Sequence, residues 1–95
     1  MKEIYFKIRG RVQGVGYRRF AVRKAKEIGD LSGWVRNAED GSVEVLVKGQ
    51  EQKVEEMIEV CRKGPLFGRV DGISFLPKVT NCFLPPITDG VFERI

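Results

Sequence analysis

The hydrophobic pattern of the chain changes its period repeatedly, and the order of these changes constrains the fold more than any other feature. Apolar residues at alternate positions predict strands, whereas apolar residues three or four positions apart predict helices. On this basis the chain contains, in order, a strand, a helix, two strands, a helix and a strand, over residues 3–9, 18–28, 32–38, 42–48, 50–63 and 70–76. Asp40-Gly41, between the two consecutive strands, is typical of a tight hairpin turn.

This order predicts an α+β fold. Two right-handed β-α-β crossovers joined by a hairpin give a ferredoxin-like α/β sandwich, with an antiparallel sheet and both helices on one face. We expect residues 1–95 to form a single domain. Residues 77–90 contain three prolines and are expected to form a loop. Residues 91–95 are expected to add a short final strand, whose register the sequence leaves open.

The composition is that of a soluble globular protein, with 42% apolar and 32% charged residues. No apolar run approaches the roughly 20 residues that a membrane span needs. The first residues, MKEIYFKIRGR, lack the apolar core of a signal peptide. We therefore expect a cytoplasmic protein that does not act at a membrane. Because no extended apolar surface stripe is evident, we also expect a monomer.

Positive charge is concentrated at one end of the chain. Residues 1–26 contain nine Lys or Arg and one acidic residue, a net charge of +8, whereas the remaining residues carry a net charge of −4. Such a concentration favours an anionic partner near the N-terminal segment. A solvated basic face is the alternative interpretation of the same pattern.

The stretch GRVQGVGYR, Gly10–Arg18, lies between the first strand and the first helix. Glycines let successive backbone N–H groups turn inward into an anion-binding nest, and a helix start adds unpaired N–H groups and the positive end of the helix dipole. Arg18 can hold two oxygens of a phosphate with its planar guanidinium. The stretch therefore favours a phosphate site over an ordinary tight turn, although it matches neither G-x-x-x-x-G-K-[ST] nor G-x-G-x-x-G.

The chain has no histidine and only two cysteines, Cys61 and Cys82. Without histidine the commonest general base is missing, and two distant cysteines do not make a zinc site. Cys61 falls on the apolar face of the second helix and is predicted to be a core residue. Its separation from Arg69 does not fit the Cys-x5-Arg loop of a cysteine phosphatase. Whether Cys61 and Cys82 form a disulfide cannot be decided from sequence.

Four sequence pieces together resemble the acylphosphatase family. They are GRVQGVGYR at 10–18, GWVRN at 33–37, DGSVEV at 40–45 and Gly64-Pro65, in the order and at the separations of that family. The resemblance covers residues 4–73. The chain departs from the family pattern at Tyr17, where Phe is commoner, and at Gly68, where Ala is commoner. Its last residues also differ from the usual F-x-[IV]-R ending.

The resemblance implies a function, namely hydrolysis of small acyl phosphates to a carboxylate and inorganic phosphate. It implies no metal, no cofactor and no covalent phosphoenzyme. Arg18 would bind the phosphoryl oxygens, and Asn37 would position the attacking water. The implied phosphate-binding backbone N–H groups belong to Gln13, Gly14, Val15, Gly16, Tyr17 and Arg18. Without the resemblance, Asn37 is more typical of a residue that stabilises the neighbouring turn.

Several alternatives remain open at this point. Acylphosphatase-like domains also occur in larger maturation proteins that handle carbamoyl phosphate, and a catalytically inactive anion-binding module is another alternative. RNA binding is disfavoured, because the strand at 42–48 has no aromatic residue on which bases could stack. The remaining basic and aromatic residues are predicted to be solvated charges (Arg9, Arg11, Arg19 and Arg23) and packing residues (Tyr17 and Trp34).

Overall fold

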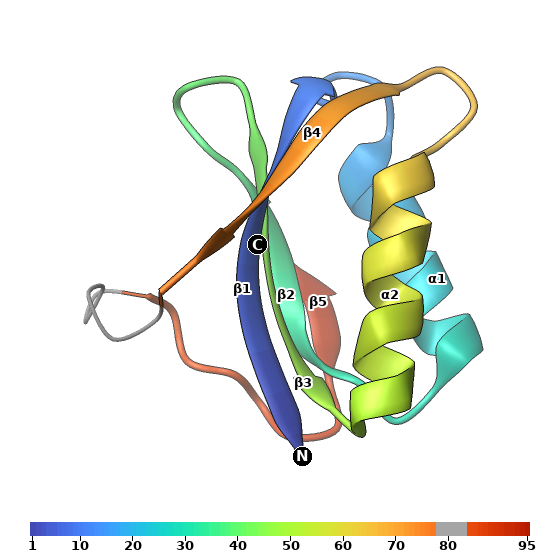
Figure 1. The fold of residues 1–95 in the computed structure, drawn as a ribbon, viewed down its shortest axis with the longest axis vertical. Coiled ribbons are helices and arrows are strands. Elements are labelled where there is room, and N and C mark those ends of the chain that lie inside the picture. The colour runs from blue at the N-terminus through green and yellow to red at the C-terminus, as the bar shows by residue number, and fades with distance from the viewer. Residues whose placement is uncertain (78–83) are drawn as a thin grey trace.

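The computed structural model describes residues 1–77 and 84–95 (Figure 1). Its elements are β1 (Lys2–Arg11), α1 (Tyr17–Ile28), β2 (Ser32–Asn37), β3 (Val43–Gly49), α2 (Glu51–Lys63), β4 (Arg69–Leu76) and β5 (Phe92–Arg94). The predicted order of strands and helices is confirmed, and the two helices lie together on one face of the sheet in Figure 1. No described helix has the length and apolar character needed to cross a lipid bilayer.

The sheet has the strand order β4-β1-β3-β2-β5. The first four strands pair antiparallel, as predicted, and β5, whose register the sequence left open, pairs parallel to β2. The end of the sheet at which β4 finishes accounts for the direction of β5. β4 runs opposite to β1 and ends where β1 and β2 begin, so the chain that follows it enters β5 from that end (Figure 1). The pairing of β5 with β2 places Phe92 opposite Gly33 and Arg94 opposite Val35.

The main core lies between the sheet and the two helices. The predicted alternation of β1 is confirmed, because Phe6 and Ile8 are fully buried on this side. The other buried residues of this cluster include Val35, Val45 and Val47 from the sheet, Ala21 and Ala25 from α1, and Val54, Met57, Ile58 and Cys61 from α2. Helix α1 therefore docks through Tyr17 at its start and through the small Ala21 and Ala25 along its length, whereas α2 docks through four larger side chains.

The opposite face of the sheet holds a second, smaller core. Tyr5, Trp34 and Leu46 are buried there, and Leu84 and Ile87 pack against them. Residues 84–87 thus lie against this face, and the indole N–H of Trp34 donates to the carbonyl of Pro85 at 2.9 Å. Because Tyr5, Phe6 and Trp34 are buried, the inner strands β1, β2 and β3 present no exposed aromatic side chain, whereas Phe75 on the edge strand β4 is 52% exposed. The predicted packing role of Trp34 is confirmed.

The start of α1 is fastened to the end of α2 by a buried hydrogen bond. The hydroxyl of Tyr17, which is 2% exposed, donates to the carbonyl of Cys61. In a continuing helix the residue four positions later would donate to that carbonyl, but this residue is Pro65, which has no N–H. Tyr17 therefore satisfies a helix-end carbonyl and holds the first residue of α1 against the core.

Cys61 lies in the main core, as predicted. Burial raises the pKa of its thiol to about 12, so the thiol stays protonated near neutral pH and is not a nucleophile. Cys82 falls outside the described residues, and so does any disulfide between Cys61 and Cys82.

We expect Tyr17→Phe to lower the free energy of unfolding by about 1–2 kcal/mol, because the ring remains while the buried carbonyl of Cys61 loses its donor. Urea unfolding followed by circular dichroism would measure this loss. Tyr17→Leu, which also removes ring packing, should cost more. An unchanged midpoint for Tyr17→Phe would show that this hydrogen bond contributes nothing to stability.

Candidate functional site

A glycine-containing loop, residues 12–16, joins the end of β1 to the start of α1. Gly14 and Gly16 have φ angles of 76° and 80°, which side-chain-bearing residues rarely adopt. No other atom lies within 4 Å of where a Cβ would stand at either residue. Backbone conformation therefore requires both glycines, and their lack of side chains leaves the loop backbone accessible.

The helix that follows this loop begins without a side-chain cap. Gly16 is the N-cap residue of α1, no described side chain caps it, and the first turn contains no acidic residue. The first N–H groups of a helix have no partner within the helix, and the helix dipole places partial positive charge there. By contrast, α2 has Glu51 in its first turn. The start of α1 is therefore suited to bind an anion.

A hollow of about 320 Å³ opens at this point. Its lining comes from the loop, the first residues of α1, the end of β2 and the end of β5. The lining residues are Val12, Gly14, Gly16, Tyr17, Arg18, Arg19, Asn37 and Arg94. None of them is acidic, so the charged side chains of the hollow are three arginines.

The structure brings together the two residues for which sequence predicted chemical roles. Arg18 and Asn37 are distant in sequence, yet both line this hollow, Arg18 from the first turn of α1 and Asn37 from the end of β2. The Arg18 guanidinium donates from Nη1 to the carbonyl of Ile95 at 3.3 Å. This distance lies beyond the range of about 2.7–3.2 Å that is usual for N–H···O hydrogen bonds. The guanidinium is therefore only weakly held.

The six predicted loop residues do not all line the hollow. Gly14, Gly16 and Tyr17 do so together with Arg18, but Gln13 and Val15 do not. The side chain of Tyr17 is buried in the core, so its backbone faces the hollow, and the half-buried Val15 packs against the same core. Backbone N–H binding by the whole loop stays a prediction.

Gln13 has a role that the sequence did not indicate. Its amide nitrogen donates to the carbonyls of Ala38 and Ser42, both at 2.8 Å. These two residues flank the turn between β2 and β3, directly after Asn37. Gln13 therefore fastens the glycine loop to the hairpin that carries Asn37.

Two arginines of the hollow were not among the predicted site residues. Arg19 was predicted to be a solvated charge; it is exposed, but it also lines the hollow. Arg94 was not considered, because the register of the final strand was open. Once Phe92 is placed in the core, strand alternation puts Arg94 on the same side of β5. This alternation was the only signal available for it.

The hairpin beside Asn37 is stabilised by a carboxylate. Asp40 accepts a hydrogen bond from the Lys7 ammonium at 2.8 Å and another from the backbone N–H of Ser42 at 3.0 Å. The Lys7 and Ser42 hydrogen bonds hold the pKa of Asp40 well below its ordinary value, and the hydrogen bond with Asp40 raises the pKa of Lys7. The turn that follows Asn37 is thus held by a hydrogen bond within the hairpin and by an ion pair with Lys7 of the neighbouring strand β1.

Comparison with known proteins gives consistent results. The family model described as Acylphosphatase matches residues 4–81. The chain is 54% identical over 74 residues to a protein named Acylphosphatase from Nitrobacter winogradskyi, covering 78% of this chain and 74% of that protein. The crystal structure of an acylphosphatase from Bacillus subtilis superposes with a TM-score of 0.83 and 33% identity, covering 100% of this chain and 99% of that one. The crystal structure of HypF from T. kodakarensis superposes with a TM-score of 0.75 and 34% identity, but the match covers only 12% of that chain.

We expect Asp40→Asn to destabilise the protein near neutral pH, with a loss that shrinks on acidification. A carboxylate whose pKa is lowered by folding stabilises the folded state above its ordinary value of 3.8, and this stabilisation disappears as pH falls through the lowered native pKa. Urea unfolding of both proteins between pH 7 and pH 2 would measure the difference. Glu39→Gln removes the same charge from the same hairpin and is the control. An equal effect of that control would show that net charge, and not the Asp40 contacts, is responsible.

Proposed function

This chain belongs to the acylphosphatase family, and we propose that it hydrolyses acyl phosphates with Arg18 and the glycine-loop backbone binding the phosphoryl group and Asn37 positioning the water. The observation that carries this assignment of roles is the meeting of Arg18 and Asn37 at one hollow beside an uncapped helix start. The products are a carboxylate and inorganic phosphate.

The phosphoryl group is held by charge and by directed N–H groups. The backbone of residues 13–18 and the start of α1 supply N–H donors, and the Arg18 guanidinium supplies a planar pair of donors. Because its only described hydrogen bond is the 3.3 Å contact with the Ile95 carbonyl, the Arg18 guanidinium can turn to phosphoryl oxygens at little cost. Such preorganised donors stabilise the charge on the equatorial oxygens in the transition state.

Asn37 orients the attacking water. Its backbone is fixed by pairing with Val43 in the hairpin, while its side chain is exposed and lines the hollow. The amide oxygen accepts a hydrogen bond from water, which holds the water in line with the phosphorus. Because the departing carboxylate is a good leaving group, positioning and charge stabilisation matter more than a strong base. A substrate oxygen takes the proton of the water.

The proposed mechanism needs neither a metal nor a protein base. The described residues that line the hollow include no Asp, Glu, His or Cys. The described residues also contain no group of three or more such side chains that could hold a metal ion. The chemistry offered to an anion is therefore that of N–H groups and guanidinium.

We further propose that residues 1–95 act as a single domain, as a monomer in the cytoplasm, without nucleic acid or membrane partners. The burial of Tyr5 and Phe6 under covered sheet faces argues against base stacking. The match to 99% of the Bacillus subtilis chain supports the single domain.

Hydrolysis of benzoyl phosphate in EDTA, followed by absorbance, tests the proposed roles. We expect activity in the wild type and a loss of about 100-fold or more in kcat/KM for Arg18→Ala and Asn37→Ala. Arg18→Ala should also raise KM, because it removes a phosphate ligand, whereas Asn37→Ala should act mainly on kcat. Lys24→Gln, on the same helix but outside the hollow, should change little. Circular dichroism verifies that each variant is folded.

The opposite outcome has a distinct meaning. If the wild type is inert while inorganic phosphate still raises its melting temperature, the chain is an anion-binding module and the hydrolytic proposal fails. If Arg18→Ala and Asn37→Ala remain folded and fully active, the assignment of roles is wrong.

A further inference from the structure

A groove leads away from the phosphate hollow between α1 and β5. Two further hollows, of about 400 and about 610 Å³, lie along it. Arg94 lines the phosphate hollow and both further hollows. Arg19 lines the phosphate hollow and the hollow of about 400 Å³, and Lys26 lines the hollows of about 400 and about 610 Å³. Because neighbouring hollows share these residues, they are sections of one continuous groove that begins at the phosphate hollow and ends beside Gly29.

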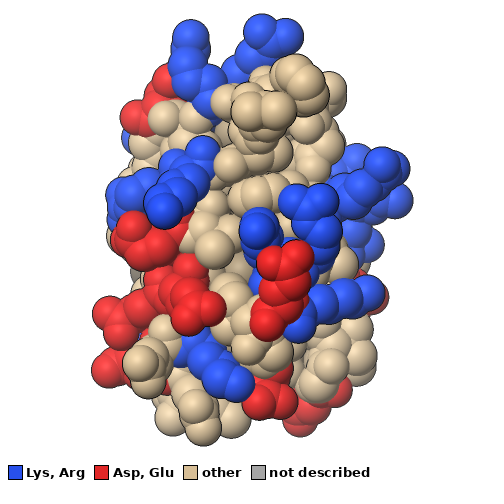
Figure 2. Space-filling model, turned by 90° about the vertical axis from the view of Figure 1, so that its right-hand side faces the viewer, with Lys and Arg blue, Asp and Glu red and all other residues tan. Residues whose placement is uncertain are grey.

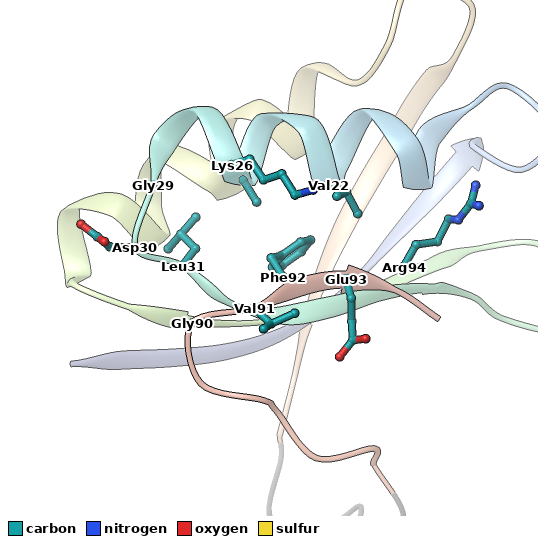
Figure 3. A pocket seen from close by; sticks show the side chains of 11 residues that line it. Val22, Lys26, Gly29, Asp30, Leu31, Gly90, Val91, Phe92, Glu93 and Arg94 are labelled. Carbon is teal, nitrogen blue, oxygen red and sulfur yellow. The ribbon is translucent and has the colours of Figure 1, made fainter.

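The groove has an apolar floor and cationic sides. Figure 3 shows its far section, with Phe92 and Val22 between the strand and the helix. Lys26 extends along α1 toward Val22, and therefore toward the start of the helix, as the tilt of helical Cα–Cβ bonds favours. Arg94 stands at the end nearest the phosphate hollow.

Most cations of the groove lack acidic partners. Within residues 1–77 and 84–95, no ion pair involves Arg19, Lys26 or Arg94, whereas Arg23, which lines the hollow of about 400 Å³, pairs with Glu27 at 3.8 Å. Two acids border the far section, but the Asp30 carboxylate pairs with Lys53 at 2.9 Å and the Glu93 side chain extends away from the groove in Figure 3. On the helical side of the molecule, Figure 2 shows Lys and Arg gathered along the right-hand flank. The groove therefore carries uncompensated positive charge.

The length of the groove suits a short acyl chain. Arg18 and Lys26 are eight residues apart on α1, which separates their Cα atoms by about 12 Å along the axis. The Lys26 side chain returns part of that distance toward the phosphate hollow. An acyl phosphate with a four-carbon chain places a terminal carboxylate about 6 Å from phosphorus. Its methylenes would then lie on the apolar floor while the carboxylate meets the groove cations.

From this arrangement we infer that the groove is an acyl-group subsite that selects acyl phosphates whose acyl chain ends in a second carboxylate. Lys26 is the specificity-determining residue for that carboxylate, and Arg94 lies between the two anionic ends of the substrate. This inference rests on the proposed hydrolysis of acyl phosphates at the adjoining hollow. It adds the class of acyl group that the chain prefers.

Succinyl phosphate and butyryl phosphate both have four-carbon acyl chains, but only succinyl phosphate ends in a second carboxylate. The ratio of their kcat/KM values therefore measures the contribution of that carboxylate. We expect the ratio to favour succinyl phosphate in the wild type and to fall about threefold in Lys26→Gln, as befits one solvent-exposed ion pair. Lys26→Glu should lower it further, and added salt should reduce the wild-type preference. Lys24→Gln removes the same charge from α1 and should leave the ratio unchanged. An equal ratio in the wild type and Lys26→Gln would overturn the inference.

Binding of unreactive analogues separates this inference from the proposed hydrolysis. Calorimetry would compare 5-phosphonopentanoate with pentylphosphonate, which have the same five-carbon chain and differ in the carboxylate. Tighter binding of 5-phosphonopentanoate that is lost in Lys26→Gln and kept in Lys24→Gln supports the groove, even if the wild type hydrolyses neither acyl phosphate. Equal binding of the two phosphonates by the wild type would refute the groove, even if both acyl phosphates are hydrolysed.

Discussion

The side-chain amide of Gln13 joins the two segments that carry the predicted site residues. It donates to the carbonyls of Ala38 and Ser42, so the loop before α1 is fastened to the turn after β2. Arg18 follows that loop and Asn37 precedes that turn. Proposed binding of the phosphoryl group and positioning of water both require a fixed distance between these two side chains. The site therefore depends on a neutral side chain that does not itself line the hollow.

Helix α1 connects the phosphate hollow with the rest of the molecule. Its first residue, Tyr17, is anchored to the end of α2, and Ala21 and Ala25 pack into the main core. With one face buried in this way, the basic residues of α1 remain on the outside, where Arg19 and Lys26 border the groove toward β5. The helix thus supplies N–H donors at its start and cations along its length. The same amphipathic pattern that docks the helix also sets the charge of the groove.

Much of the fold follows from local pattern. The periods of the apolar residues predicted all six longer elements, because side-chain direction repeats every two residues in a strand and about every 3.6 residues in a helix. The direction of β5 did not follow, since it depends on the end of the sheet at which the preceding chain emerges. The second core around Trp34 was also not predicted, because it forms with residues 84–87 of a segment that has no periodic pattern. Within the candidate site, Arg18 and the glycines were predicted from the glycine-rich stretch and Asn37 from the family resemblance, whereas Arg94 and the side-chain role of Gln13 were not predicted.

The sequence by itself determined the order of the elements, the glycines of the loop and the family to which the chain belongs. These are properties of short segments, in which backbone preference and hydrophobic period act over a few residues. Only the tertiary structure decided which residues from distant segments share a surface. Arg94 reaches the phosphate hollow because β5 pairs with β2, and the groove exists because that pairing leaves space beneath α1. Contacts between segments far apart in sequence depend on how whole elements pack together, and no local pattern encodes that packing.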